Sequence, residues 1–478
     1  MSEDLAGVDA TAQADLVRRR QISPRELVDA AIAGIERVNP KINAVILPLF
    51  ERARAEAGSA LPDGPFRGVP FLLKDLDGTL EGAPLHCGMK FLQRRKWVEN
   101  HDSYLVRKFR EAGFVIVGKT NTPELGLTVT TEPEAYGPSR NPWNPERSTG
   151  GSSGGSSAAV AAGLVPAAHA SDGGGSIRIP ASECGLVGLK PSRGRVSLGP
   201  DFGEQWHGLV ISHAVTRSLR DTAAILDAVS GPMPGDPYAA PTPSRPFLQE
   251  VGADPGRLRV GLLTTLEGRV VHPDCVAAVR ETGRVLESLG HHVEESQPDA
   301  FAAPEFIQKF MVVVTAWTAL GLDEWGRRAG QAIGASDVEP ATWALAEIGR
   351  GHGAREYLGA VEWLQSWTRR MAAWWAGGFD LLVTPTIGEP PPRIGELVPT
   401  AGDPLGKMDR LLGLVPFTPP FNATGQPAMS LPLHWNGEGL PIGVQFVGAY
   451  GREDLLLRIG AQLEQAMPWK DRRPPIFV

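Results

Sequence analysis

Short apolar runs alternate with amphipathic stretches over much of the chain, and this alternation limits the folds that it can adopt. Ser23 and Glu26 form a capping box with proline at the first helical position, so a helix is expected here, ending before Pro40. The apolar runs at residues 68–73 and 258–263 are typical of buried strands. Helices and strands in this order predict an α/β protein, with a mostly parallel or mixed β-sheet covered by helices on both faces.

Composition excludes several other classes of protein. Glycine (56) and proline (42) make up about a fifth of the 478 residues, above the ~12% of average usage, and they would break the helices of a bundle or coiled coil. The apolar content of 42% and the net charge of −7 disfavour a disordered chain. The mild acidity also argues against nucleic acid as a partner.

Cysteine spacing and hydropathy bear on the compartment. The three cysteines lie far apart and none belongs to a C-x-x-C pair, which predicts free thiols and no metal site. The N-terminus is acidic and has no apolar signal-peptide core, and the longest mostly apolar run, residues 310–322, is shorter than the ~20 residues of a membrane span. We therefore expect a cytoplasmic protein with no membrane partner.

Tryptophan is concentrated in residues 300–378, which have a helical pattern. Seven of the twelve tryptophans lie there: Trp317, Trp325, Trp343, Trp363, Trp367, Trp374 and Trp375. Such a cluster can be the core of a helical insert, or it can be a bulky apolar wall over a substrate cleft. Both interpretations remain open from the residues alone.

Two short motifs match known patterns in the wrong local context. Residues 113–120 fit the Walker A pattern, but the four variable positions are Phe-Val-Ile-Val, which predict a strand and not a phosphate-binding loop. Residues 150–154 fit G-x-S-x-G, yet a polar, proline-broken segment precedes them where a nucleophile elbow needs a strand. That elbow would also need His352 or His434 as its base. Neither site is expected.

Residues 150–197 combine glycine and serine clusters with short apolar elements, which argues against a flexible linker. Clustered glycines let backbone N–H groups approach a ligand, and the glycines after Asp172 can converge on an oxyanion. Ser176, at the end of this cluster, is placed to attack a carbonyl held there. A serine needs a base, and a buried lysine that stays neutral can serve.

These segments resemble the amidase signature family over essentially the whole chain. Within the family, the likeness is strongest to bacterial 6-aminohexanoate-cyclic-dimer hydrolases, through residues 131–135 and 450–457. The motifs that carry the family resemblance are GVPFLLKD at residues 68–75, GKTN at 118–121, NPW at 141–143, GGSSGG at 150–155, DGGGSIRIPA at 172–181, GLKP at 188–191, PPFNATGQP at 419–427 and GLPIGVQ at 439–445.

The resemblance implies a Ser-Ser-Lys triad and the amidase-signature fold, in which a large, mixed, twisted β-sheet is sandwiched between α-helices. Ser176 corresponds to the nucleophile, Ser152, after a cis peptide bond, to the bridging serine, and Lys74 to the base. The implied oxyanion hole consists of the backbone N–H groups of Gly173, Gly174, Gly175 and Ser176.

Other positions are implied to support these groups. Asp172 and Arg178 would hold the glycine loop, Ser153 would assist the hydroxyl relay, and Gly126 and Leu127 correspond to pocket-lining positions. Many members have threonine where this chain has Gly173, but the expected donors are backbone groups, so activity is not in doubt.

The resemblance implies one amidase-signature domain over residues 1–478, with N-terminal helices at 1–60, a signature core at about 65–230 and a tryptophan-rich cover at about 300–378. It implies an amidase that acts through a serine acyl-enzyme on linear or cyclic, apolar or aryl amides. Carbamate (urethane) or ester hydrolysis by the same triad is an alternative, and so is a glutaminase subunit of a tRNA-dependent amidotransferase. No cofactor or metal is expected, and the chain is expected to act as a monomer or homodimer on a small-molecule amide or carbamate.

Overall fold

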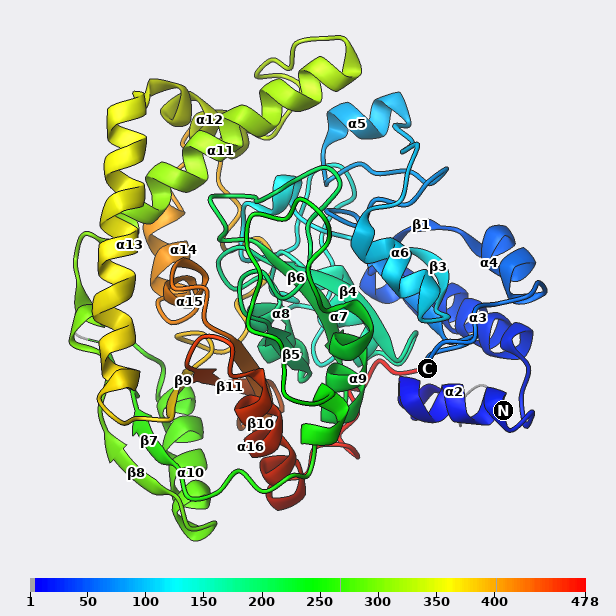
Figure 1. Ribbon diagram of the computed structural model, residues 1–478. Coiled ribbons are helices and arrows are strands. Elements are labelled where there is room, and N and C mark those ends of the chain that lie inside the picture. Colours follow the sequence, from blue (N-terminus) through cyan, green and yellow to red (C-terminus); the bar gives the residue numbers. More distant parts are fainter. Residues whose placement is uncertain (1–4, 267, 401) are drawn as a thin grey trace.

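The computed structural model describes residues 5–266, 268–400 and 402–478 (Figure 1). Within these ranges, eleven strands form one mixed sheet in the order β1-β3-β2-β4-β6-β5-β10-β11-β9-β7-β8. The strands are β1 (Val45–Pro48), β2 (Pro70–Lys74), β3 (Val115–Thr120), β4 (Ala167–Asp172), β5 (Val187–Lys190), β6 (Ile211–Thr216), β7 (Arg259–Leu262), β8 (His292–Glu295), β9 (Leu381–Pro385), β10 (Ala428–Trp435) and β11 (Pro441–Gly448). Strand β2 runs parallel to both β3 and β4, and β7 runs parallel to β8 and β9.

Helices cover both faces of this sheet. Phe71 and Leu73 pack into one hydrophobic cluster with α6, α9, α10 and α16, whereas Leu72, between them, packs into another with α3, α7 and α8. The helices are α2 (Ala10–Arg18), α3 (Pro24–Ile42), α4 (Phe50–Ala57), α5 (Lys90–Arg95), α6 (Tyr104–Glu111), α7 (Gly154–Ala161), α8 (Arg178–Cys184), α9 (Leu219–Val229), α10 (Pro273–Ser288), α11 (Phe306–Ala329), α12 (Pro340–Gly351), α13 (Ala354–Ala376), α14 (Met408–Leu414), α15 (Pro419–Ala423) and α16 (Glu453–Ala466). The predicted α/β architecture is therefore confirmed.

Helix α3 begins as predicted and ends later than predicted. Both hydrogen bonds of the capping box at Ser23 are present. Pro40 lies inside the helix, which continues to Ile42. The C-terminus is fixed by Asn43 in the left-handed conformation and by the Asn39 side chain, which accepts from the next two backbone N–H groups. Because the helix ends two residues after Pro40, the proline disturbs only the last turn.

Neither the Walker-like segment nor the G-x-S-x-G segment has the local structure that its motif requires, as expected. Residues 115–120 form strand β3, and the Walker-like Lys119 is buried in it with its Nζ 3.7 Å from Asp75 Oδ1. Serine 152 follows an irregular segment and not a strand. Residues 150–197 form α7, β4, α8 and β5, and α7 and β4 are buried throughout, so this segment is no linker.

The helical pattern at residues 300–378 is confirmed, since α11, α12 and α13 lie together at one side of the molecule (Figure 1). All seven tryptophans of this region belong to or pack against two hydrophobic clusters, which favours the core-packing interpretation for most of their surface. Helix α11 is long and apolar enough to cross a membrane by length and composition alone, but half of its apolar window is buried inside the protein, as in an ordinary core helix.

Candidate active site

The carboxyl ends of β2 and β4 bring the predicted base and the glycine loop together. These strands are parallel neighbours, and parallel strands end at the same edge of a sheet. Lys74 is the last residue of β2, and Asp172, which precedes the glycines, is the last residue of β4. Lys74 is fully buried, and its Nζ donates to Ser152 Oγ at 2.7 Å and to Ser171 Oγ at 3.1 Å.

Burial shifts the acid–base behaviour of Lys74. Loss of solvent lowers its pKa from 10.5 to about 8, although the negative charges of Asp77 and Asp172 oppose the shift. Both of its hydrogen-bond partners are neutral hydroxyls. A lysine in this environment can lose its proton near neutral pH and act as a general base.

The loop that carries Ser152 is held by backbone and hydroxyl contacts. The Gly151–Ser152 peptide bond is cis, as the resemblance implied. The Thr122 hydroxyl donates to Ser152 O at 2.9 Å, and Thr131 Oγ1 donates to Gly150 O at 2.9 Å. Ser153 donates to Ser171 O at 3.3 Å and is fully buried. Ser153 therefore joins this loop to β4 and takes no part in the contact between Lys74 and Ser152.

Ser176 is half-buried, unlike Lys74 and Ser152, and lies two residues before α8. In the described residues, no hydrogen bond links Ser176 Oγ to Ser152 Oγ; the bonds of catalytic groups often tighten only when substrate is bound. Of the three predicted triad positions, Lys74 and Ser152 are therefore joined by a hydrogen bond, and Ser176 follows the end of β4 by four residues.

The glycine loop offers fewer open N–H groups than predicted. Among the described residues, the N–H groups of Gly173, Gly174 and Ser176 make no hydrogen bond to protein. The N–H of Gly175, which we expected in the oxyanion hole, donates to Asp172 Oδ1 at 2.7 Å. The reason is local: Asp172 caps the turn that its own strand leads into, and its carboxylate also accepts from Ile177 N at 3.1 Å.

Asp172 and Arg178 form a buried ion pair that fixes this loop. Both side chains are fully buried, and Arg178 donates from Nε to Oδ2 and from Nη2 to Oδ1 of Asp172, each at 2.9 Å. Burial alone would raise the pKa of Asp172, but the Arg178 guanidinium holds it well below its usual range. Asp172 therefore stays ionised, and the loop keeps its shape.

Three further residues complete this network, and we had given none of them a role. Asn422 donates to Asp172 Oδ1 at 2.8 Å, Gln445 Oε1 accepts from Arg178 at 2.7 Å, and the backbone oxygen of Thr418 accepts from Arg178 at 3.0 Å. Asn422 and Gln445 lie in motifs of the family resemblance, which was the one available signal.

Of the two predicted pocket residues, Gly126 lies beside Ser152 and Leu127 lies against an apolar cluster. A Cβ on Gly126 would be 2.7 Å from Leu76 Cδ2 and 3.1 Å from Ser152 Oγ, so a glycine is needed for the chain to pass this close to Ser152. Leu127 packs against the hydrophobic cluster that contains Phe310 of α11. This cluster connects the site to the tryptophan-rich helices.

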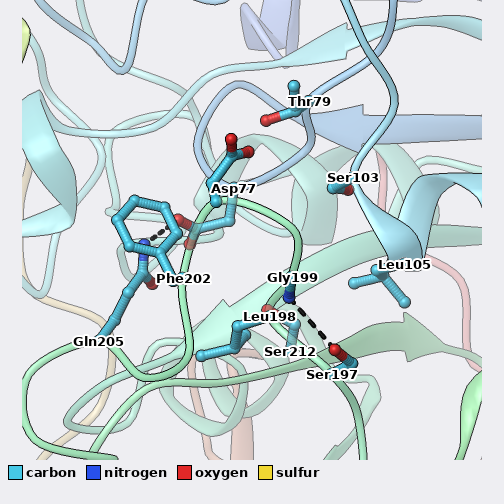
Figure 2. A pocket seen from close by; sticks show the side chains of 11 residues that line it. Asp77, Thr79, Ser103, Leu105, Ser197, Leu198, Gly199, Phe202, Gln205 and Ser212 are labelled. Carbon is cyan, nitrogen blue, oxygen red and sulfur yellow. Dashed lines mark hydrogen bonds between the residues drawn. The ribbon is translucent and has the colours of Figure 1, made fainter. Parts of the chain in front are cut away.

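A small cavity of about 20 Å³ is lined by Asp77, Gln205 and Ser212, among other residues (Figure 2). Ser212, which lines it, pairs across the strands with Ser171, a partner of Lys74. Gln205 donates to Asp77 Oδ1 at 3.2 Å across this cavity. A cavity of this size has room for about one water molecule.

The three cysteines, Cys87, Cys184 and Cys275, are buried and form no disulfide. Within the described ranges, no group of three or more His, Cys, Asp or Glu side chains is arranged to hold a metal ion.

The sequence profile of the amidase family matches residues 26–457. The chain belongs to the amidase family. It is 46% identical to a 6-aminohexanoate-cyclic-dimer hydrolase of Pseudomonas sp. (strain NK87), over 98% of this chain and 97% of the relative. This membership makes the protein a hydrolase of carbon–nitrogen bonds other than peptide bonds.

Solved structures agree with this assignment. The structure of a 6-aminohexanoate cyclic dimer hydrolase complexed with substrate matches with a TM-score of 0.95 and 45% identity, over 99% of this chain and 100% of that one. A bacterial aryl acylamidase of the amidase signature enzymes matches with a TM-score of 0.88 and 26% identity, over 98% and 97% of the two chains. The predicted amidase-signature fold is thus confirmed.

Proposed function

We propose that this amidase hydrolyses its substrate through an acyl-enzyme on Ser176, with Ser152 as the bridging serine and Lys74 as the base. The observation that carries the proposal is the buried Lys74, which donates to Ser152 at 2.7 Å and has its pKa lowered to about 8 by burial. A buried lysine that has neither a carboxylate partner nor contact with solvent is a candidate general base. This one contacts two serines, at the edge of the sheet where a glycine loop presents open N–H groups.

The reaction begins with neutral Lys74. Lys74 takes the proton of Ser152, which takes the proton of Ser176, and Ser176 Oγ attacks the substrate carbonyl carbon. The carbonyl oxygen becomes an oxyanion held by the N–H groups of Gly173, Gly174 and Ser176. The carbon–nitrogen bond then breaks, and the relay returns the proton to the leaving amine. Water attacks the acyl-enzyme by the same relay and releases the acid and free Ser176.

We propose linear or cyclic amides of apolar or aryl character as substrates. The likeness to a 6-aminohexanoate-cyclic-dimer hydrolase and to an aryl acylamidase supports this class. The apolar cluster of Leu127, Phe310 and their neighbours supports it as well, because it borders the triad. In this proposal α11–α13 of the single domain cover the substrate, the chain acts in the cytoplasm as a monomer or homodimer, and neither nucleic acid nor a membrane is a partner.

Carbamates and esters remain alternative substrates, since both present an acyl carbonyl to Ser176 and differ only in the leaving group. A glutaminase subunit is less well supported, because the relatives described above over the full length act on other amides. Turnover of amide, carbamate and ester substrates with one common acyl group would rank the three bond types. Hydrolysis of a simple amide by the purified chain alone would argue against the glutaminase role.

The decisive variant is Ser176→Ala, tested with a p-nitroanilide substrate. We expect loss of the burst of nitroaniline and of at least about 10³-fold in kcat, as for other nucleophile removals. Ser157→Ala is the matched control, because the buried Ser157 hydroxyl has no hydrogen-bond partner among the described residues. Wild-type turnover by Ser176→Ala would refute the assignment.

A further inference from the structure

Gly173, the first residue of the glycine loop, lies against an aromatic ring. A Cβ built on Gly173 would be 3.1 Å from both Cε3 and Cζ3 of Trp206 and 3.2 Å from Val210 Cγ2. Contacts this short require a neighbour to move, so the six-membered ring of Trp206 already fills the space of a side chain at position 173. The indole of Trp206 can therefore pack this closely on the loop because position 173 has no side chain.

The chain holds Trp206 firmly in this position. Trp206 and His207 both have a left-handed backbone, with φ of 49° and 53°. On one side of this turn, the Gln205 side chain donates to Asp77 Oδ1 at 3.2 Å, and Asp77 follows Lys74 by three residues. On the other side Arg193 Nε donates to Gly208 O at 2.7 Å. A turn anchored on both sides presents its side chain as a fixed wall and not as a mobile lid.

A second aromatic residue continues this wall. A Cβ on Gly174 would be 3.6 Å from Cζ of Phe310, which projects from α11. Trp206 is half-buried and packs against the cluster that contains Phe310 and Leu127. The two open N–H groups that precede the nucleophile are therefore flanked by rings, one from the loop at 201–207 and one from the tryptophan-rich helices.

We propose that Trp206 is a specificity-determining residue, which closes the space beside the reacting carbonyl and selects acyl groups that are unbranched at the carbon next to it. The inference rests on the proposed function, because it places the carbonyl oxygen at the N–H groups of Gly173 and Gly174. An acyl chain attached to that carbonyl must leave along the indole. A branch at the adjacent carbon would need the volume that Trp206 occupies.

The test compares the p-nitroanilides of hexanoic and 2-methylhexanoic acid. We expect Trp206→Ala to raise the ratio of kcat/KM for the branched over the linear substrate by about tenfold, as one methyl group in a tight pocket commonly does. Trp206→Phe removes the six-membered ring that contacts position 173 but keeps a smaller ring, and it should give a ratio between those of the wild type and Trp206→Ala. Trp325→Ala is the matched control, since Trp325 lies fifteen residues further along α11 than Phe310, about 22 Å away along the helix.

A second variant keeps the proposal open to refutation even if Trp206→Ala does not fold. Gly173→Ala adds a methyl group that pushes against the ring, and it should lower kcat/KM more in the wild-type background than beside Trp206→Phe or Trp206→Ala. An unchanged branched-to-linear ratio in a folded Trp206→Ala enzyme, or equal effects of Gly173→Ala in all backgrounds, would overturn the proposal. If the proposed function itself fails, the wild type releases no nitroaniline from either substrate, which is a distinct result.

Discussion

The protonation of Lys74 should control the activity of this enzyme. With its pKa lowered to about 8, about one molecule in ten has a neutral Lys74 at pH 7 and about nine in ten at pH 9. We therefore expect kcat/KM for a non-ionising anilide to rise about tenfold between these pH values and to level off above pH 9. A fall in the pKa of Lys74 from 10.5 to about 8 corresponds to about 3 kcal/mol against the charged form.

The assay is the pH dependence of kcat/KM from pH 5.5 to 10 at constant ionic strength, with thermal melting at each pH to exclude unfolding. A profile that is flat over this range would refute Lys74 as the base. So would a rise that continues to an apparent pKa near 10.5, since burial would then have no effect on the lysine.

The same shift predicts a stability difference that does not depend on catalysis. The unfolded chain binds more protons at Lys74 than the folded chain between about pH 8 and 10.5, so this lysine adds stability as the pH rises through that window. Its contribution is present above pH 10.5 and is lost as the pH falls through 8. The unfolding free energy of wild type relative to Lys74→Met should thus increase by up to about 3 kcal/mol from pH 7 to 11, measured by urea denaturation.

For three further substitutions, the structure predicts the direction of the effect on activity or stability. Asp77→Asn removes a negative charge that favours charged Lys74, so the acid limb of the rate profile should move to lower pH; a shift to higher pH would contradict this. Arg178→Met leaves the Asp172 carboxylate buried without its partner and should lower the unfolding free energy by about 3–5 kcal/mol in urea denaturation; a loss below 1 kcal/mol would show that the pair does not hold the loop. Burial raises the pKa of Glu124 from 4.5 to about 8, so its contribution to stability should fall as the pH rises between these values, and Glu124→Gln should reduce that fall in denaturation measured at pH 5 and 8.5; an unchanged pH dependence would argue that this carboxyl is ionised throughout.

Much of the site could be predicted because its residues lie in short motifs with local consequences. Lys74 follows a strongly apolar strand, which places it at the end of a buried strand, and the glycines after Asp172 indicate a backbone that approaches a ligand. The capping box at Ser23 is equally local. The end of α3 is not determined locally. The contacts of Asn39 and Asn43 that terminate this helix depend on the direction in which the chain continues.

Contacts between distant segments could not be predicted from the residues. Asn422 reaches Asp172 across 250 positions, and Gln445 reaches Arg178 across 267. The packing of Trp206 on Gly173 is of the same kind, since only the folded sheet brings residues 201–207 beside the glycine loop. The hydrogen bond from Gly175 N–H to Asp172 could not be predicted either. Residues 173–176 each carry a backbone N–H group, and only the shape of the folded turn decides which of them reaches the carboxylate.

The same burial has opposite effects on the two ionisable groups at the ends of β2 and β4, and the difference lies in their partners. Lys74 and Asp172 are both fully buried. Lys74 contacts two hydroxyls, which can donate to a neutral amine or accept from it, so the neutral form keeps its hydrogen bonds and the pKa falls. Asp172 contacts a guanidinium that stays charged, so the carboxylate remains ionised. One strand end thus supplies a group able to exchange a proton, while its neighbour supplies a fixed charge that shapes the glycine loop before Ser176. In the proposed mechanism, the base and the oxyanion loop would therefore come from the ends of two neighbouring strands, each with its own type of partner.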